Sequence, residues 1–183
     1  VAEKIDIDII VHLYPVMTKA FYPVETLTKL AEIEQVKALK MGTRDMAIYE
    51  RDIRILRSEC PDLAILTCHD EYLLSSMYVG VDGALIGFAG CIPEVIGEAW
   101  EAVKNYDFRR TRALQEQIFP MADAVYGIGQ PSGEAHARMK EALFQRRIFS
   151  SPLMREPVLP LSDAEKQRVS KALCTAKIGT VNI

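Results

Sequence analysis

The chain has 183 residues, of which 49% are hydrophobic and 26% charged, and its formal net charge is −3. This composition can bury a core, which excludes intrinsic disorder and low-complexity fibres. Basic residues are scattered among acids and no run of about 18 apolar residues occurs, so we expect neither nucleic-acid binding nor a membrane span. The four cysteines form no CxxC pair, which favours reduced thiols in a cytoplasmic protein over zinc ligands or disulfides.

The first part of the chain alternates predicted strands with predicted helices. The expected strands cover 5–11, 35–40, 63–66 and 83–86, and the helices that follow them cover 23–33, 45–58, 72–78 and 93–104. This alternation predicts parallel strands joined by right-handed crossovers, in either a barrel or an open doubly wound sheet. The β-branched first strand is typical of a strand buried on both faces. No glycine-rich phosphate loop follows a strand, which disfavours the open flavodoxin-like sheet.

After residue 105 the pattern predicts helices alone. They are expected over 107–126, 134–146 and 163–176. The sequence Ser162-Asp163-Ala164-Glu165 is a capping box, which predicts where the last of them begins. We therefore expect an α/β region over 1–105 and a helical domain over 106–183.

The carboxyl ends of the strands are the expected place for chemistry in a parallel α/β protein. Lys40 ends the second strand on the face that carries Val36 and Ala38. Partial desolvation there would favour a free amine that attacks a carbonyl and forms a Schiff base. A solvated lysine at a strand end is the alternative. His12 after the first strand could likewise be structural, and the adjacent residues His69, Asp70 and Glu71 cannot all face one ion, so we expect no metal site.

Two segments resemble the dihydrodipicolinate synthase and N-acetylneuraminate lyase family. They are 36–45, with the sequence VKALKMGTRD, and 80–87, with the sequence GVDGALIG, and the similarity extends over nearly the whole chain. The resemblance implies a (β/α)8 TIM barrel, here represented by strands 5–8 only, followed by a C-terminal helical domain. It also implies a homotetramer that needs no cofactor, in which the strand-6 lysine condenses with a 2-oxo acid such as pyruvate. Lys40 falls on that lysine.

The resemblance implies that the residue that relays protons in the family is replaced by a different residue in this chain. When the chain is aligned on Pro15, the family's tyrosine falls on His12, and Tyr14 is the second candidate for that role. Histidine can also relay protons near neutral pH. The arginine that holds a substrate carboxylate in the lysine-pathway synthases falls on Met17, which argues against that activity.

The resemblance also implies a set of substrate-binding residues. Asp70 and Glu71 align with carboxylates that bind sugar hydroxyls in the sialic-acid lyases, and carboxylates accept several hydrogen bonds at once. Gly87 stands in place of a serine of those lyases, which opens room in the pocket. Thr18 and Leu85 complete the expected set. A 2-keto-3-deoxy sugar acid therefore fits better than aspartate semialdehyde.

Three interpretations of the function stay open. The leading one is a Schiff-base-forming lyase, aldolase or dehydratase, that acts on a 2-oxo acid. The others are a 4-hydroxy-tetrahydrodipicolinate synthase and a catalytically silent family member that serves as a binding or regulatory scaffold. A complete barrel needs about 250 residues, and the chain starts without Met, so we expect it to be the second half of a longer barrel.

Overall fold

The computed structural model describes residues 2–127 and 133–180. The chain divides into two compact units, Val1–Ile86 and Gly87–Ile183. The first unit contains all the parallel strands of the described residues, and the described part of the second unit contains helices only. The boundary predicted between residues 105 and 106 marks where a barrel would end and a helical domain would begin. It does not describe compact units, and it stays a prediction.

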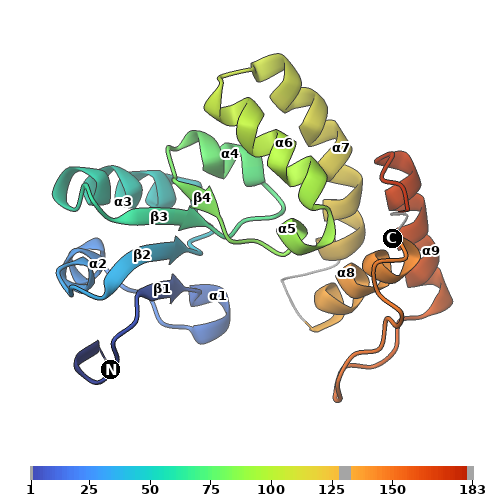
Figure 1. Ribbon diagram of the computed structural model, residues 1–183, viewed down its shortest axis with the longest axis horizontal. Coiled ribbons are helices and arrows are strands. Elements are labelled where there is room, and N and C mark those ends of the chain that lie inside the picture. The colour runs from blue at the N-terminus through green and yellow to red at the C-terminus, as the bar shows by residue number, and fades with distance from the viewer. Residues whose placement is uncertain (1, 128–132, 181–183) are drawn as a thin grey trace. The chain divides into compact units, whose positions relative to one another are not determined.

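The first unit is built on a four-stranded parallel sheet in which the strands follow one another in chain order (Figure 1). Its strands are β1 (Ile9–Leu13), β2 (Val36–Met41), β3 (Ala64–Thr67) and β4 (Gly83–Ala84). Its helices are α1 (Pro15–Thr18), α2 (Val24–Ala31), α3 (Met46–Glu59) and α4 (Leu73–Tyr78), after a short 3-10 helix at Ala2–Lys4. The predicted strand and helix alternation is therefore confirmed, although the first strand begins four residues later than expected.

The two faces of this sheet differ in burial. Leu39 and Ile65 share one face and are fully buried there, because α2 packs on β2 and α4 packs on β3; Lys37, nearer the start of β2 on the same face, is exposed. On the opposite face, Ile10 is 49% exposed and His12 is also exposed. The expectation that the first strand is buried on both faces is therefore wrong. The reason is that β1 is an edge strand, and the described residues cover only the side on which Leu13 lies.

Helix α3 begins and packs as its sequence dictates. The Asp45 side chain accepts hydrogen bonds from the backbone N–H groups of Ala47 and Ile48, which caps the first turn. Ile53 and Leu56 are buried. Ile48 is 38% exposed, because it lies about 100° around the helix from the buried row at 49, 52, 53 and 56.

The second unit is a group of packed helices. They are α5 (Phe88–Cys91), α6 (Pro93–Lys104), α7 (Phe108–Tyr126), α8 (Gly133–Gln145) and α9 (Asp163–Thr175). The capping box predicted at Ser162 and Glu165 is confirmed, with both reciprocal hydrogen bonds present. The buried Arg138 on α8 pairs with Glu165 at 2.9 Å and donates to the Val125 carbonyl at 3.0 Å, which ties α8 to both α7 and α9.

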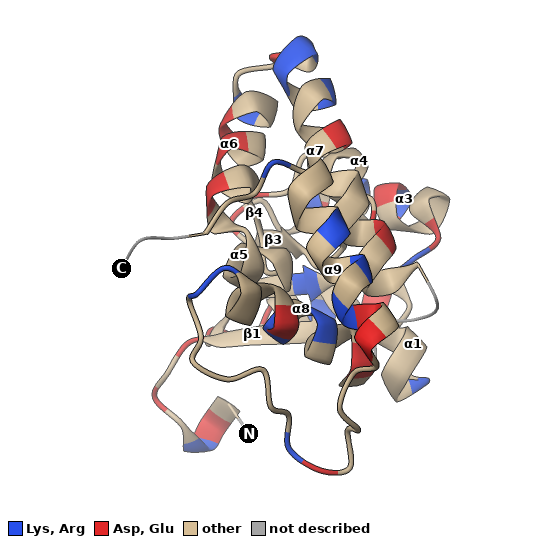
Figure 2. Cartoon of the chain, turned by 90° about the vertical axis from the view of Figure 1, so that its right-hand side faces the viewer, with Lys and Arg blue, Asp and Glu red and all other residues tan. Residues whose placement is uncertain are grey.

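Basic and acidic residues are interspersed over the helices in view (Figure 2). Among the described residues, no helix is long and apolar enough to cross a membrane.

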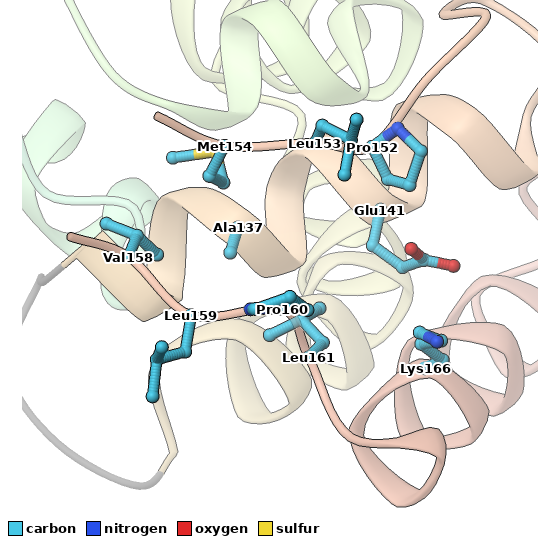
Figure 3. Close-up of a pocket in the computed structure, with 10 residues that line it drawn as sticks. All are labelled: Ala137, Glu141, Pro152, Leu153, Met154, Val158, Leu159, Pro160, Leu161 and Lys166. Carbon is cyan, nitrogen blue, oxygen red and sulfur yellow. The ribbon is translucent and has the colours of Figure 1, made fainter. Parts of the chain in front are cut away.

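A cavity of about 150 Å³ lies between α8 and the chain segment that leads to α9 (Figure 3). Its lining is mostly apolar and consists of Ala137, Glu141, Pro152, Leu153, Met154, Val158, Leu159, Pro160, Leu161 and Lys166. None of the residues singled out from the sequence lines it. The strand ends of the first unit therefore remain the place to look for a functional site.

Two substitutions on α3 test the packing of the first unit. Ile53 is 1% exposed, so Ile53→Ala should lower the free energy of unfolding by about 2–4 kcal/mol. Ile48→Ala on the same helix should cost less than about 1 kcal/mol, because Ile48 is already partly in water. Chemical denaturation, together with hydrogen exchange of the β2 and β3 amides, measures both. Equal losses in the two variants would contradict this assignment of faces.

Candidate functional site

The register of the sheet brings His12 and Lys40 together. His12 on β1 is the lateral partner of Lys40 on β2, and Lys40 is in turn the partner of Leu66 on β3. Lateral partners in a sheet lie about 5 Å apart at the backbone and point to the same face. That face is the open one, on which Lys40 is half-buried and His12 is exposed. An amine and an imidazole therefore stand side by side at the carboxyl ends of adjacent strands.

The surroundings of His12 favour its neutral form. Partial desolvation and the neighbouring charge of Lys40 both lower the pKa of His12. Its ring stacks on Tyr14, with ring centroids 5.2 Å apart and planes 12° from parallel. A neutral imidazole can accept a proton from a group bound nearby.

The surroundings of Tyr14 favour its protonated form. Desolvation, followed by the effect of Cys68, raises the pKa of Tyr14, so that its phenol keeps its proton. Because its ring stacks on His12, the two candidates for proton relay lie on the same side of the strand end.

Gly42 allows the strand ends to come this close. A Cβ atom at residue 42 would overlap the carbonyl oxygen of Leu13 at the end of β1 and would lie 3.2 Å from the Cys68 sulfur after β3. The chain leaving β2 thus fills the gap between its two neighbours with backbone alone. Any larger residue would push the strand ends apart.

An ion pair links the loops after β2 and β3. Arg44 Nη2 lies 2.5 Å from Glu71 Oε1, and the Arg44 guanidinium carbon lies 5.8 Å from the centroid of the Tyr72 ring. The two charged side chains are 29% and 20% exposed. Sequence reasoning missed Arg44. Its position in the loop directly after the Lys40 strand was the available signal, because ligands bind beyond the carboxyl ends of parallel strands.

An aromatic layer lies beneath this ion pair. The His69 ring stacks on Tyr72 with centroids 4.5 Å apart, and meets Tyr49 edge-on at 5.2 Å. Burial, and then the positive charge of Arg44, lower the pKa of His69 to about 4. Burial also raises the pKa of Cys68 to about 11, which favours the protonated thiol at neutral pH. In the described ranges, no three His, Cys, Asp or Glu side chains come together as metal ligands.

The predicted substrate-binding residues of the first unit differ in their burial and in their hydrogen-bond partners. Asp70 is 5% exposed and Glu71 is the partner of Arg44. The Thr18 hydroxyl donates to the Tyr14 carbonyl oxygen at 3.0 Å, where it closes α1. Leu85 follows β4 with its side chain 43% exposed, and its N–H donates to the Thr67 carbonyl at 2.9 Å. Contact of these residues with a substrate stays a prediction.

Gly87 has a packing role within the second unit. A Cβ there would lie 2.7 Å from the Met139 sulfur and 3.2 Å from the Tyr126 hydroxyl. Neighbouring side chains therefore occupy the space that the absent serine side chain was expected to leave open. Its role toward a substrate stays a prediction.

The low pKa of His69 makes stability depend on pH. The unfolded chain takes up this proton near pH 6.5, whereas the folded chain does so only near pH 4. Above about pH 6.5 His69 is neutral in both states, and its protonation does not lower the free energy of unfolding. As the pH falls, protonation of the unfolded chain lowers this free energy, by about 2 kcal/mol at pH 5. Urea unfolding at pH 7 and pH 5 measures it. The His69→Phe variant keeps an aromatic ring but has no titrating group there. Its free energy of unfolding should therefore fall by about 2 kcal/mol less between pH 7 and pH 5 than that of the wild type. An unchanged pH dependence would contradict the assignment.

The sequence matches a known protein family. The profile of the Dihydrodipicolinate synthetase family matches residues 1–176. The 4-hydroxy-tetrahydrodipicolinate synthase 2 of Clostridium acetobutylicum is 22% identical over 173 residues, which cover 94% of this chain and 58% of the relative. The N-acetylneuraminate lyase 2 of Escherichia coli is 24% identical over 166 residues, which cover 88% of this chain and 50% of the relative.

Solved structures show the same fold. The chain superposes on dihydrodipicolinate synthase from Aquifex aeolicus with a TM-score of 0.83 and 22% identity, covering 99% of this chain and 59% of the other. It superposes on KD(P)GA from T. tenax with a TM-score of 0.77 and 21% identity, covering 96% and 58%. The chain thus spans little more than half the length of the proteins it matches. Because the family profile covers nearly all of its residues, the chain belongs to the Dihydrodipicolinate synthetase family.

Proposed function

We propose that the chain carries the Lys40 part of a Schiff-base-forming lyase that acts on a 2-oxo acid. The observation that supports this most directly is the lateral pairing of Lys40 with His12 on the open face of the sheet. A nucleophilic amine and a neutral base beside it are the two groups that iminium chemistry needs. The names of the relatives, a synthase and a lyase of one family, point the same way.

The reaction would proceed through a covalent intermediate. The Lys40 amine attacks the C2 carbonyl, water leaves, and the iminium nitrogen becomes positively charged. In aldol cleavage, His12 or Tyr14 takes the proton of the C4 hydroxyl, a carbonyl forms at C4, and the electron pair of the C3–C4 bond moves into the iminium to give an enamine, which takes a proton back at C3. In dehydration, the same group removes a C3 proton to give the enamine, which expels the C4 hydroxyl together with a proton as water. Both routes end on an iminium, which water hydrolyses to free the product ketone and the Lys40 amine. These steps require no metal and no organic cofactor.

We also infer how the chain fits a larger fold. Its four parallel strands in chain order would be strands 5–8 of a (β/α)8 TIM barrel, and residues 106–183 its C-terminal helical domain. Support comes from the open face of the sheet and from the share of the relatives' length that the chain covers. A homotetramer in the cytoplasm, with pyruvate or a 2-keto-3-deoxy sugar acid as the substrate, completes the proposal.

A second candidate function is 4-hydroxy-tetrahydrodipicolinate synthase. The printed name of the Clostridium relative favours it. Met17 opposes it, because a 56% exposed thioether offers no positive charge to a substrate carboxylate at the position where an arginine was expected.

Borohydride reduction in the presence of pyruvate tests the Schiff base. A covalent pyruvate adduct should appear on Lys40 and be located by peptide mass spectrometry. Lys40→Met should abolish it. Lys37→Met is the matched control, since Lys37 is an exposed lysine on the other face of the same strand, and the adduct should persist. An adduct absent from the wild type with pyruvate and several other 2-oxo acids would leave only the silent scaffold.

His12→Ala and Tyr14→Phe separate the two candidates for proton relay. If His12 is the main relay, His12→Ala should lower kcat by about 100-fold, whereas Tyr14→Phe should lower it less. Borohydride trapping should still label Lys40 in both variants. Steady-state kinetics measure the two losses, and a larger loss in Tyr14→Phe would assign the relay to the tyrosine.

A further inference from the structure

The cavity beside α8 lies wholly within the second unit and is bordered by a buried carboxylate (Figure 3). Glu141, which supplies it, is 5% exposed. Its Oε1 atom accepts a hydrogen bond from Gln145 Nε2 at 2.9 Å. Within the described residues, Oε2 has no hydrogen-bond partner and neither oxygen has an ion-pair partner. Because a carboxylate can accept about four hydrogen bonds, Glu141 has unused capacity.

Lys166 does not supply the missing positive charge. Its amine and the Glu141 carboxylate lie toward the same end of the cavity (Figure 3), but the amine pairs with Asp163 at 3.2 Å. No ion pair joins Lys166 to Glu141 in the part of the chain that the structure describes. A buried carboxylate without an opposite charge costs free energy. A cation that enters the cavity would therefore be stabilised at Glu141.

Apolar side chains form most of the remaining lining. They come from two arms of the segment between α8 and α9, residues 152–154 and 158–161, which flank Ala137 of α8 (Figure 3). The volume of about 150 Å³ equals that of an apolar cavity that takes up a molecule the size of benzene. An apolar group of about five or six carbon atoms therefore fits between the arms.

Hydrogen bonds hold both arms against α8. Lys140 Nζ donates to the Leu153 carbonyl oxygen of the first arm. The second arm leads into α9, where the Lys166 carbonyl oxygen accepts from Gln145 Nε2 at 3.1 Å. The Gln145 amide thus links Glu141 to the start of α9. Since the fold already shapes the cavity, little ordering is needed when a ligand enters.

The charge and the lining together select the class of ligand. A neutral apolar molecule would fill the cavity but would leave the Glu141 carboxylate without a partner. A simple anion would face this carboxylate at close range and be repelled. An ammonium group carries the missing charge and donates to Oε2, while an apolar body attached to it lies along Ala137.

We propose that this cavity binds a small amphipathic amine, in which a primary ammonium group is attached to a branched or aromatic body of about five or six carbon atoms. The ammonium group pairs with Glu141. A free amine and the amino group of an apolar amino acid share this chemistry. The inference is independent of the proposed function, because no residue of the cavity belongs to the strand ends around Lys40.

Four molecules that share an isobutyl group test the site. They are 3-methylbutan-1-amine, 3-methylbutan-1-ol, 3-methylbutanoate and L-leucine. Each is titrated into the full chain at pH 7, and NMR follows the methyl signals of Ala137, Met154 and Leu161. The amine should shift these signals and should bind about tenfold more tightly than the alcohol or the carboxylate, because hydrogen bonds between charged groups are the stronger ones.

Leucine distinguishes the two sources of the ammonium group. An affinity equal to that of the amine would mean that Lys166 donates to its carboxylate, and Lys166→Met should then weaken leucine without weakening the amine. An affinity about tenfold lower would mean that free amines are the ligands.

Two variants locate the binding on Glu141 and on the cavity. Glu141→Gln removes the charge and keeps the shape of the side chain, so the affinity for the amine should fall about tenfold and that for the alcohol should change by less than about twofold. Ala137→Val narrows the cavity and should weaken both molecules. Glu116→Gln is the matched control, because Glu116 is an exposed acid on α7 of the same unit, and both affinities should be unchanged.

Several results would overturn the proposal. They are an amine that does not bind, an amine and an alcohol that bind the wild type equally, and an affinity for the amine that Glu141→Gln leaves unchanged. The comparison of amine and alcohol in the wild type remains decisive if Glu141→Gln does not fold. Leu159 is 79% exposed at the rim of the cavity. A lower oligomeric state of Leu159→Asp in analytical ultracentrifugation would assign the cavity to a contact between copies of the chain and would also overturn the proposal.

Discussion

The close approach of three strand ends at Gly42 is the constraint on which the site depends. Without a side chain at this position, the backbone leaving β2 contacts the end of β1 and approaches Cys68 after β3. Two residues before Gly42, His12 lies beside Lys40 in the parallel register of β1 and β2. The loops that follow then place Tyr14, Arg44 and Glu71 around the same point. An amine with an imidazole beside it thus lies at the strand ends that meet at Gly42.

Partial burial gives these strand ends a consistent electrostatic character. It lowers the pKa of the two histidines, His12 and His69, and raises the pKa of Tyr14, Cys68 and Tyr72. Each of these groups is therefore held in its neutral form near neutral pH. Arg44 and Glu71 remain charged but neutralise each other. In these surroundings, the positive charge on a Lys40 iminium would be the main change in charge during the proposed reaction.

Much of this arrangement could be predicted from the sequence, because local patterns determine it. The alternation of strands and helices, the capping box at Ser162 and the position of Lys40 at a strand end all depend on short segments. The exposure of β1 could not be predicted in the same way, since a β-branched run does not reveal whether its strand lies at an edge. The pair of Arg44 and Glu71 joins residues 27 positions apart, and only the fold brings them together. The packing of Met139 against Gly87 is another contact between distant segments.

A crystal structure of the protein after reduction with borohydride and pyruvate tests the central claim most directly. The account predicts continuous density from Lys40 Nζ to the C2 atom of the reduced pyruvate, with the His12 ring or the Tyr14 hydroxyl within hydrogen-bond distance of the bound group. Density on a different lysine, or a pyruvyl group on Lys40 that faces neither His12 nor Tyr14, would contradict it.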